Sequence, residues 1–93
     1  SYLRELEHLR EKIDVSDQAI LDALGKRMKV AESIGELKKD NNVAVLQNKR
    51  WNEILETMQA EGVERNLSEE FITQIFKAIH QESINHQEKV ING

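Results

Sequence analysis

Residues 2–40, YLRELEHLREKIDVSDQAILDALGKRMKVAESIGELKKD, decide the fold of this chain. Apolar residues recur along this stretch at the spacing that places them on one face of an α-helix. They are Leu3, Leu6, Leu9, Ile13, Ile20, Leu24, Met28, Ala31, Ile34 and Leu37. Asn41 and Asn42 form the first credible helix end. The pattern therefore predicts a single helix over residues 2–40.

The length of this helix has a consequence for assembly. At 1.5 Å per residue it would extend about 58 Å, whereas a compact globule of 93 residues has a radius of gyration of about 12 Å. Such a helix extends beyond its own subunit, where its leucine stripe would face water. We therefore expect an intertwined homodimer of six helices, in which the first helices of two chains pair and exchange. A break near residues 14–17, which would give a helical hairpin, is the alternative.

Two further helices are expected, which makes the chain an all-α single domain over residues 1–93. The second is predicted over 47–61, with Gly62 as its C-cap, and the third over 68–90, with Ser68 as its N-cap. The residues expected to face inward from these helices are Trp51, Ile54, Leu55, Met58, Phe71, Ile72, Ile75, Phe76, Ile79, Ile84 and Ile91. Proline is absent and glycine numbers four, a composition that favours helix over sheet.

Composition and charge argue against several classes of function. The chain has 13 basic and 17 acidic residues, a net charge of −4, so a nucleic-acid partner is not expected. No apolar run reaches the ~20 residues that span a membrane, and we expect a cytoplasmic protein. His8, His80 and His86 lack the spacing of metal ligands, and no glycine-rich phosphate loop occurs. Neither a metal nor a cofactor is expected.

Cationic residues lie on the apolar face of the first predicted helix. Arg27 and Lys38 fall within about 20° of Ile20 around the helix axis, and Arg10 lies at the edge of the stripe, about 80° away. Burying an unpaired charge costs several kcal/mol, so these cations need partners. In one interpretation they pair internally, with Asp17 serving Arg10 or Arg27.

The other two helices show the same feature. Gln47 and Arg50 share a face with Ile54, and Ser83 and Gln87 share a face with Ile79. Taken together, these residues favour a second interpretation, in which the helices surround a cationic pocket for a small anion. Both interpretations remain open on periodicity alone.

The order of these residues resembles a known family. The segment Leu9-Arg10-Glu11-Lys12-Ile13-Asp14 is followed by Asp17, Ile20, Leu21, Leu24, Arg27, Ile34, Gly35, Lys38, Arg50, Glu82, Ser83 and Gln87. This set is similar to the all-helical (AroQ-class, type II) chorismate mutases and covers nearly the whole chain without an insertion. The resemblance implies a domain-swapped dimer of three-helix chains.

The resemblance also implies the roles of the polar residues. Arg27 would bind one carboxylate of chorismate, and Arg10 would reach the other carboxylate from the partner subunit. Arg50 would sit near the first carboxylate. Lys38 and Gln87 would donate to the ether oxygen whose bond breaks.

The remaining site positions follow in the same way, with one departure. Ser83 would bind a carboxylate, and three isoleucines would wall the ring: Ile34, Ile54 and Ile84. The residue after the second-helix arginine is commonly glutamate in this family, where it accepts from the substrate hydroxyl, but here it is Trp51. Gln47, one turn earlier, is the expected substitute, and Trp51 is expected to pack.

The function implied by the resemblance is that of an isomerase, which converts chorismate into prephenate for the biosynthesis of phenylalanine and tyrosine. Fusion to another shikimate-pathway enzyme is also implied, since the family is often fused. One rival is an isochorismate pyruvate lyase of the same fold. A non-catalytic helical dimerisation or regulatory domain is a rival from a different class.

Overall fold

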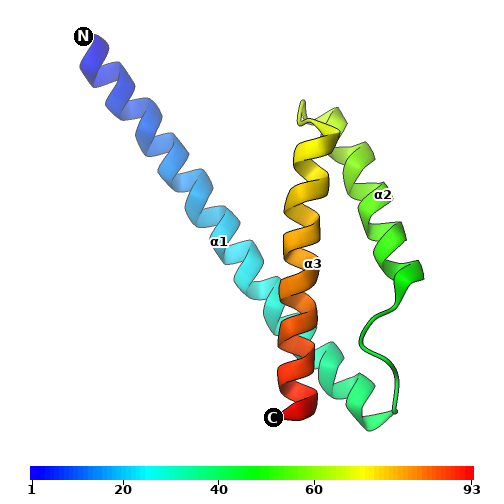
Figure 1. The fold of residues 1–93 in the computed structure, drawn as a ribbon. Helices are drawn as coiled ribbons and strands as arrows, with labels where there is room; N and C mark the ends of the chain where they lie inside the picture. Colours follow the sequence, from blue (N-terminus) through cyan, green and yellow to red (C-terminus); the bar gives the residue numbers. More distant parts are fainter.

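The computed structural model describes all 93 residues and contains three helices and no strand. They are α1 (Tyr2–Asp40), α2 (Asn48–Glu64) and α3 (Glu69–Asn92). Figure 1 shows α3 between the other two helices, and the N-terminal half of α1 extending away from the rest of the chain. α3 packs against both α1 and α2, which do not approach each other closely. The all-α prediction is therefore confirmed.

α1 is continuous, and the alternative of a break near residues 14–17 is wrong. At its start, Ser1 Oγ accepts a hydrogen bond from the backbone N–H of Arg4 at 3.4 Å. At its end, Asn41 Nδ2 donates to the Leu37 carbonyl at 2.8 Å, and Asn42 adopts a φ of 54°. Asparagine tolerates this left-handed conformation better than most residues, so the helix ends at the predicted asparagine pair.

The ends of α2 and α3 confirm one predicted cap and correct another. Ser68 Oγ accepts from the backbone N–H of Phe71 at 3.2 Å, as expected of an N-cap. Gly62 is not the C-cap of α2, because the helix continues to Glu64. Instead Gly62 is buried where α2 meets α3, and a Cβ placed on it would lie 2.6 Å from Ile72 Cγ1. The turn is made by Asn66, at a φ of 61°.

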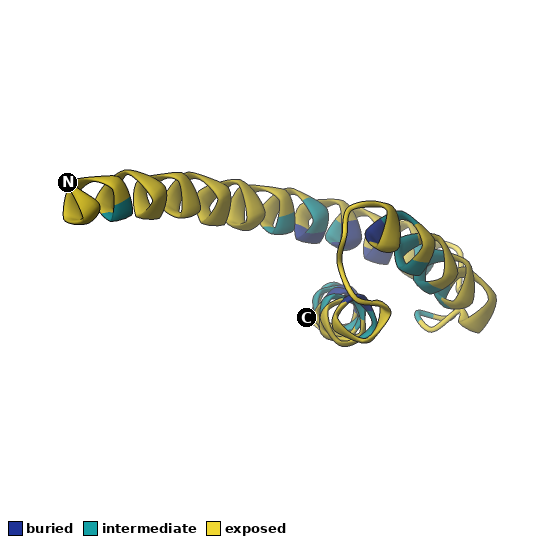
Figure 2. Ribbon diagram, turned by 90° about the horizontal axis from the view of Figure 1, so that it is seen from above, coloured by how far each residue is buried: buried dark blue, intermediate teal, exposed yellow.

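A single chain has little interior of its own. Its radius of gyration is 17.2 Å and its extents are 61 × 27 × 14 Å, well beyond the ~12 Å of a compact globule of this length. Only 7 of 93 residues are buried. Most of them lie on α1 and α3 where these two helices cross (Figure 2), and the other two, Gly62 and Ile72, lie where α2 meets α3. Ile13 and Ile20 on the extended half of α1 are 62% and 56% exposed. The N-terminal part of the predicted apolar stripe is therefore largely uncovered within one chain, whereas Met28 and Ala31 farther along it are buried.

No helix of the chain has a stretch long and apolar enough to cross a membrane.

Candidate active site

A cavity of about 420 Å³ lies between the C-terminal half of α1, the start of α2 and the C-terminal half of α3. Each helix contributes residues at the spacing i, i+3 or i+4, and i+7, which places them on one face. The lining includes these expected site residues: Arg27, Ile34, Lys38, Gln47, Arg50, Ile54, Ser83, Ile84 and Gln87. The structure thus brings together every expected site residue except Arg10.

Arg10 lies on the extended half of α1 and does not line this cavity. It precedes Arg27 by 17 positions, or about 25 Å along the helix axis, which is too far for one side chain to span. Within its own chain, Arg10 is therefore remote from the site.

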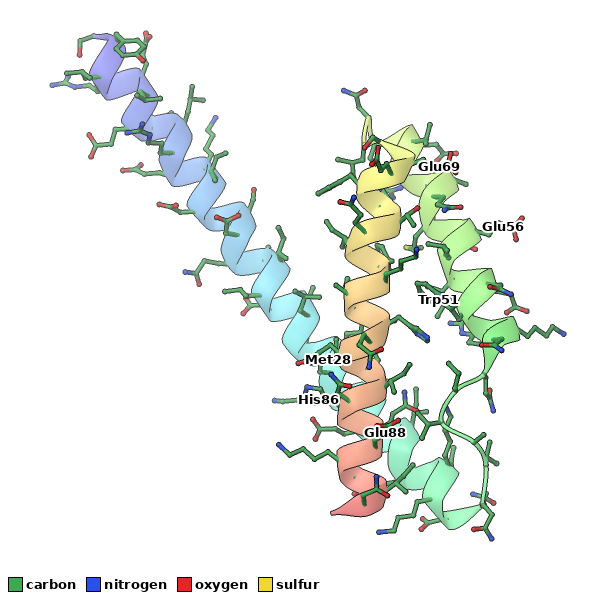
Figure 3. All side chains as sticks on the ribbon, in the orientation of Figure 1. Met28, Trp51, Glu56, Glu69, His86 and Glu88 are labelled. Atoms are coloured by element: carbon green, nitrogen blue, oxygen red, sulfur yellow. The ribbon has the colours of Figure 1, made fainter.

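Arg27 is held beside α3 by Ser83. Its Nη1 donates a hydrogen bond to Ser83 Oγ, and Ser83 itself is buried, with its Oγ 3.7 Å from the sulfur of Met28. Figure 3 shows Met28 where α1 passes α3. This packing orients the guanidinium while leaving most of its N–H groups free to bind another acceptor.

Lys38 is held by two neutral acceptors. Its Nζ donates to the backbone carbonyl of Val45 at 2.7 Å and to Gln87 Oε1 at 2.9 Å. Since Oε1 of Gln87 accepts this bond, its amide nitrogen is left as a free donor. Gln87 is buried, so its position is fixed by packing as well as by Lys38.

Arg27 and Lys38 have no carboxylate partner within the chain. No carboxylate lines the cavity, and the ion pairs of the structure are Arg50–Glu53, His86–Glu32 and His86–Glu82. The alternative in which Asp17 pairs with Arg10 or Arg27 is therefore wrong. Burial, and next the charge of Arg50, lower the pKa of Arg27. Burial alone lowers the pKa of Lys38.

These pKa directions have a simple meaning. A cation whose pKa falls on burial is destabilised by its surroundings, and a nearby anion would restore the lost stabilisation. Two fixed cations, a free amide donor and apolar walls are suited to a small, compact anion with an acceptor at its centre.

His80 also lines the cavity, although it was not among the site residues expected from the sequence. It precedes Ser83 by three positions and Gln87 by seven, so helical spacing alone could have placed it in the cavity. Its ring stacks on Trp51, with the centroids 4.1 Å apart and the planes 13° apart. Trp51 packs as expected, but it also lines the cavity.

Comparison with known proteins shows the family of this chain. The family model described as "Chorismate mutase type II" matches residues 9–88. A bifunctional chorismate mutase/prephenate dehydratase of Buchnera aphidicola subsp. Schizaphis graminum is 33% identical over 88 residues, which are 95% of this chain and 23% of that relative. A protein of the same description from Buchnera aphidicola subsp. Acyrthosiphon pisum is 32% identical over 82 residues, 88% of this chain and 21% of the relative.

The chain spans less than a quarter of the length of these relatives. The match nevertheless runs through all three helices, from Leu9 in α1 to Glu88 in α3. The chain belongs to the chorismate mutase type II family, a family of isomerases.

Proposed function

We propose that this chain is a chorismate mutase domain, which converts chorismate into prephenate in the biosynthesis of phenylalanine and tyrosine. The observation that carries the proposal is the cavity itself. It presents Arg27 and Lys38 without a carboxylate partner, next to the free amide of Gln87. A dianion with an ether oxygen between its two carboxylates matches this set of donors.

The reaction is a unimolecular rearrangement. The ether C–O bond of the substrate breaks as a new C–C bond forms, electron pairs shift around a six-membered ring of atoms, and no proton is transferred. The site therefore needs no nucleophile, acid or base. It has to hold a flexible dianion in a compact, chair-like shape and stabilise the negative charge that grows on the ether oxygen.

Lys38 and Gln87 are the groups that we assign to the ether oxygen. Lys38 donates to two acceptors, and Gln87 accepts through its side-chain carbonyl oxygen. Lys38 therefore keeps one N–H, and Gln87 its amide NH₂, as donors for the substrate, and these bonds hold both groups in position. Hydrogen bonds that strengthen as charge develops lower the barrier selectively. A 10⁶-fold acceleration corresponds to about 8 kcal/mol, and two such bonds together with orientation can supply much of it.

Arg27 and Ser83 are assigned to one carboxylate, with Arg50 nearby. Ile34, Ile54 and Ile84 wall the ring, and Gln47 is available to the substrate hydroxyl. The second carboxylate has no cation assigned to it within one chain. We assign it to Arg10 of a second copy, in a domain-swapped homodimer that also covers the apolar stripe of α1. The exposure of Ile13 and Ile20 supports such a partner.

The relatives' names support a further proposal, that this domain works beside another enzyme of the same pathway. Both relatives are described as bifunctional, and this chain matches only a part of them. A fused or associated shikimate-pathway domain fits that arrangement.

The direct test is to follow chorismate disappearance by absorbance and to identify the product. We expect prephenate from chorismate, no pyruvate from isochorismate, and a far greater loss with Arg27→Ala than with Ser83→Ala. Pyruvate release would instead indicate the lyase of the same fold. No turnover, with no rise in melting temperature on adding a bicyclic transition-state analogue, would indicate a non-catalytic dimerisation or regulatory domain.

A further inference from the structure

Trp51 and His80 form a stacked pair on the cavity wall that the proposed mechanism does not use. Their ring centroids are 4.1 Å apart and their planes differ by 13°. The pair bridges α2 and α3, and Figure 3 shows Trp51 on the side of α2 that faces α3. Stacking of the indole on the imidazole fixes the plane of the His80 ring.

His80 has hydrogen-bonding capacity that the chain leaves unused. The hydrogen bonds around the cavity join Arg27 to Ser83, and Lys38 to Gln87 and Val45, and none involves either ring of the pair. Trp51 can only donate, through its indole N–H, whereas a neutral imidazole has one donor and one acceptor nitrogen. Only His80 in this pair can accept a hydrogen bond.

Acceptors are scarce in this cavity. No carboxylate lines it, Ser83 Oγ already accepts from Arg27, and Gln87 Oε1 already accepts from Lys38. Gln47 and His80 remain. Gln47 is exposed at the N-cap of α2, whereas His80 is half-buried on α3. Of these two acceptors, His80 is therefore the one better shielded from water, and it is the better acceptor for a hydroxyl group of a bound ligand.

Burial and the neighbouring cations favour the neutral form of the His80 ring. Arg27 and Lys38 face the cavity from α1 and Arg50 from α2, while the other lining residues of α3 are uncharged. Burial, and next the charges of Arg27 and Lys38, lower the pKa of His80. A neutral ring at pH 7 retains its acceptor nitrogen.

We propose that His80, with its ring plane fixed by Trp51, accepts a hydrogen bond from the hydroxyl group of the substrate and so makes the site selective for a hydroxylated substrate. This inference rests on the proposed function. It assigns an acceptor to the substrate hydroxyl, a role that Trp51 cannot fill because its indole N–H only donates. Trp51 is a positioning residue that acts through His80. A site whose acceptor hydrogen-bonds a ligand hydroxyl discriminates against an analogue that lacks this hydroxyl.

The test compares chorismate with an analogue in which hydrogen replaces the ring hydroxyl. For chorismate, His80→Leu should lower kcat/KM by about tenfold, while the analogue should be turned over equally by both proteins. His80→Gln, which keeps an acceptor, should recover much of the loss. Trp51→Phe should preserve discrimination and Trp51→Ala should weaken it. Equal losses on both substrates, or none on chorismate, would overturn the inference.

A pH profile gives a readout that a purely structural role would not produce. With the wild type, kcat/KM for chorismate should fall as the pH drops through the lowered pKa of His80, because protonation removes the acceptor. With His80→Gln this fall should be absent. The same fall in both proteins would contradict the assignment.

The two proposals fail in different ways. If the wild type does not convert chorismate at all, the proposed function fails and the role of His80 fails with it. If the wild type is active but His80→Leu discriminates between the two substrates as the wild type does, only the role of His80 is overturned.

Discussion

Lys38 Nζ lies 2.9 Å from Gln87 Oε1, across the contact between α1 and α3. This hydrogen bond fixes which end of the Gln87 amide faces the lysine, so that its N–H₂ group is turned away as a donor. A lysine and a neutral amide thus act as neighbouring donors without neutralising each other. The proposed chemistry depends on this arrangement.

Gln87→Glu should convert this donor pair into an ion pair at neutral pH. The new carboxylate would neutralise Lys38 and place negative charge where the transition state develops its own. We expect kcat/KM at pH 7.5 to fall by about 10²–10³-fold, the usual effect of losing one such donor.

The loss in Gln87→Glu should be partly recovered as the pH falls toward the pKa of a glutamic acid, ordinarily about 4.3, because the protonated acid is again a donor. Gln87→Met, which has neither charge nor donor, is the matched control and should show no recovery in acid. A pH–rate series on both variants measures this, and parallel profiles would contradict the assigned role.

Gly35→Ala tests how closely α1 and α3 must approach. A Cβ on Gly35 would lie 3.0 Å from the Cα and 3.2 Å from the carbonyl oxygen of Gln87. These are backbone atoms, so the helices must separate. We expect a loss of about 1–3 kcal/mol in stability and a fall in kcat/KM, measured by denaturant unfolding and steady-state kinetics.

Gly25→Ala, on the same helix, is the control for Gly35→Ala. A Cβ there meets nothing within 4 Å, and we expect a gain of up to about 1 kcal/mol from the better helix former. Equal effects of the two substitutions would contradict the close approach at Gly35.

His86 connects α1 to α3 in a pH-dependent way. Its Nδ1 lies 2.8 Å from Glu32 Oε2 and its Nε2 lies 3.2 Å from Glu82 Oε2. Figure 3 shows His86 where α1 passes α3. The hydrogen bond to Glu32, and next that to Glu82, raise the pKa of His86 above its ordinary value. The protonated ring is therefore favoured in the folded chain.

The raised pKa gives the sign of the effect on stability. The contribution of His86 is fully present below its unfolded pKa of about 6.5 and is lost as the pH rises through the folded value. The melting temperature of the wild type should therefore exceed that of His86→Gln at about pH 6, and the gap should narrow toward pH 9. A constant gap in a thermal unfolding series would contradict this prediction.

Much of this fold could be predicted from the sequence, because its main signal is helical periodicity. The apolar spacing and Asn41-Asn42 were sufficient to give the bounds of α1. Gly62 was misassigned because glycine ends many helices, and its actual role depends on the approach of Ile72. That approach is a tertiary contact, which periodicity does not report.

The candidate site was predictable to a similar degree. Helical spacing placed Arg27, Lys38 and Gln87 on inward faces, and the structure lines one cavity with them. His80 was not among the site residues expected from the sequence, although it also lines the cavity. The stacking of His80 on Trp51 depends on how α2 and α3 pack, which the sequence does not specify.

Ile13→Glu tests the inferred role of the apolar stripe. Ile13 is 62% exposed in one chain, so the substitution should leave the chain helical but place a charge where a second copy is expected to pack. We expect light scattering to show dissociation, and activity to fall with it. Glu11→Ala, on the opposite face of α1, should leave both unchanged. An unaltered, active dimer of Ile13→Glu would contradict the proposed interface.

The central claim is that cations from two chains complete one cavity, and complementation between two variants tests it most directly. Arg10→Ala and Arg27→Ala are each expected to be inactive. When equal amounts are dissociated and reassembled, half of the dimers should be mixed, as native mass spectrometry can verify, and each mixed dimer has one intact cavity. About one quarter of the wild-type activity should then return. Mixed dimers without activity, or full activity of Arg10→Ala alone, would contradict the claim.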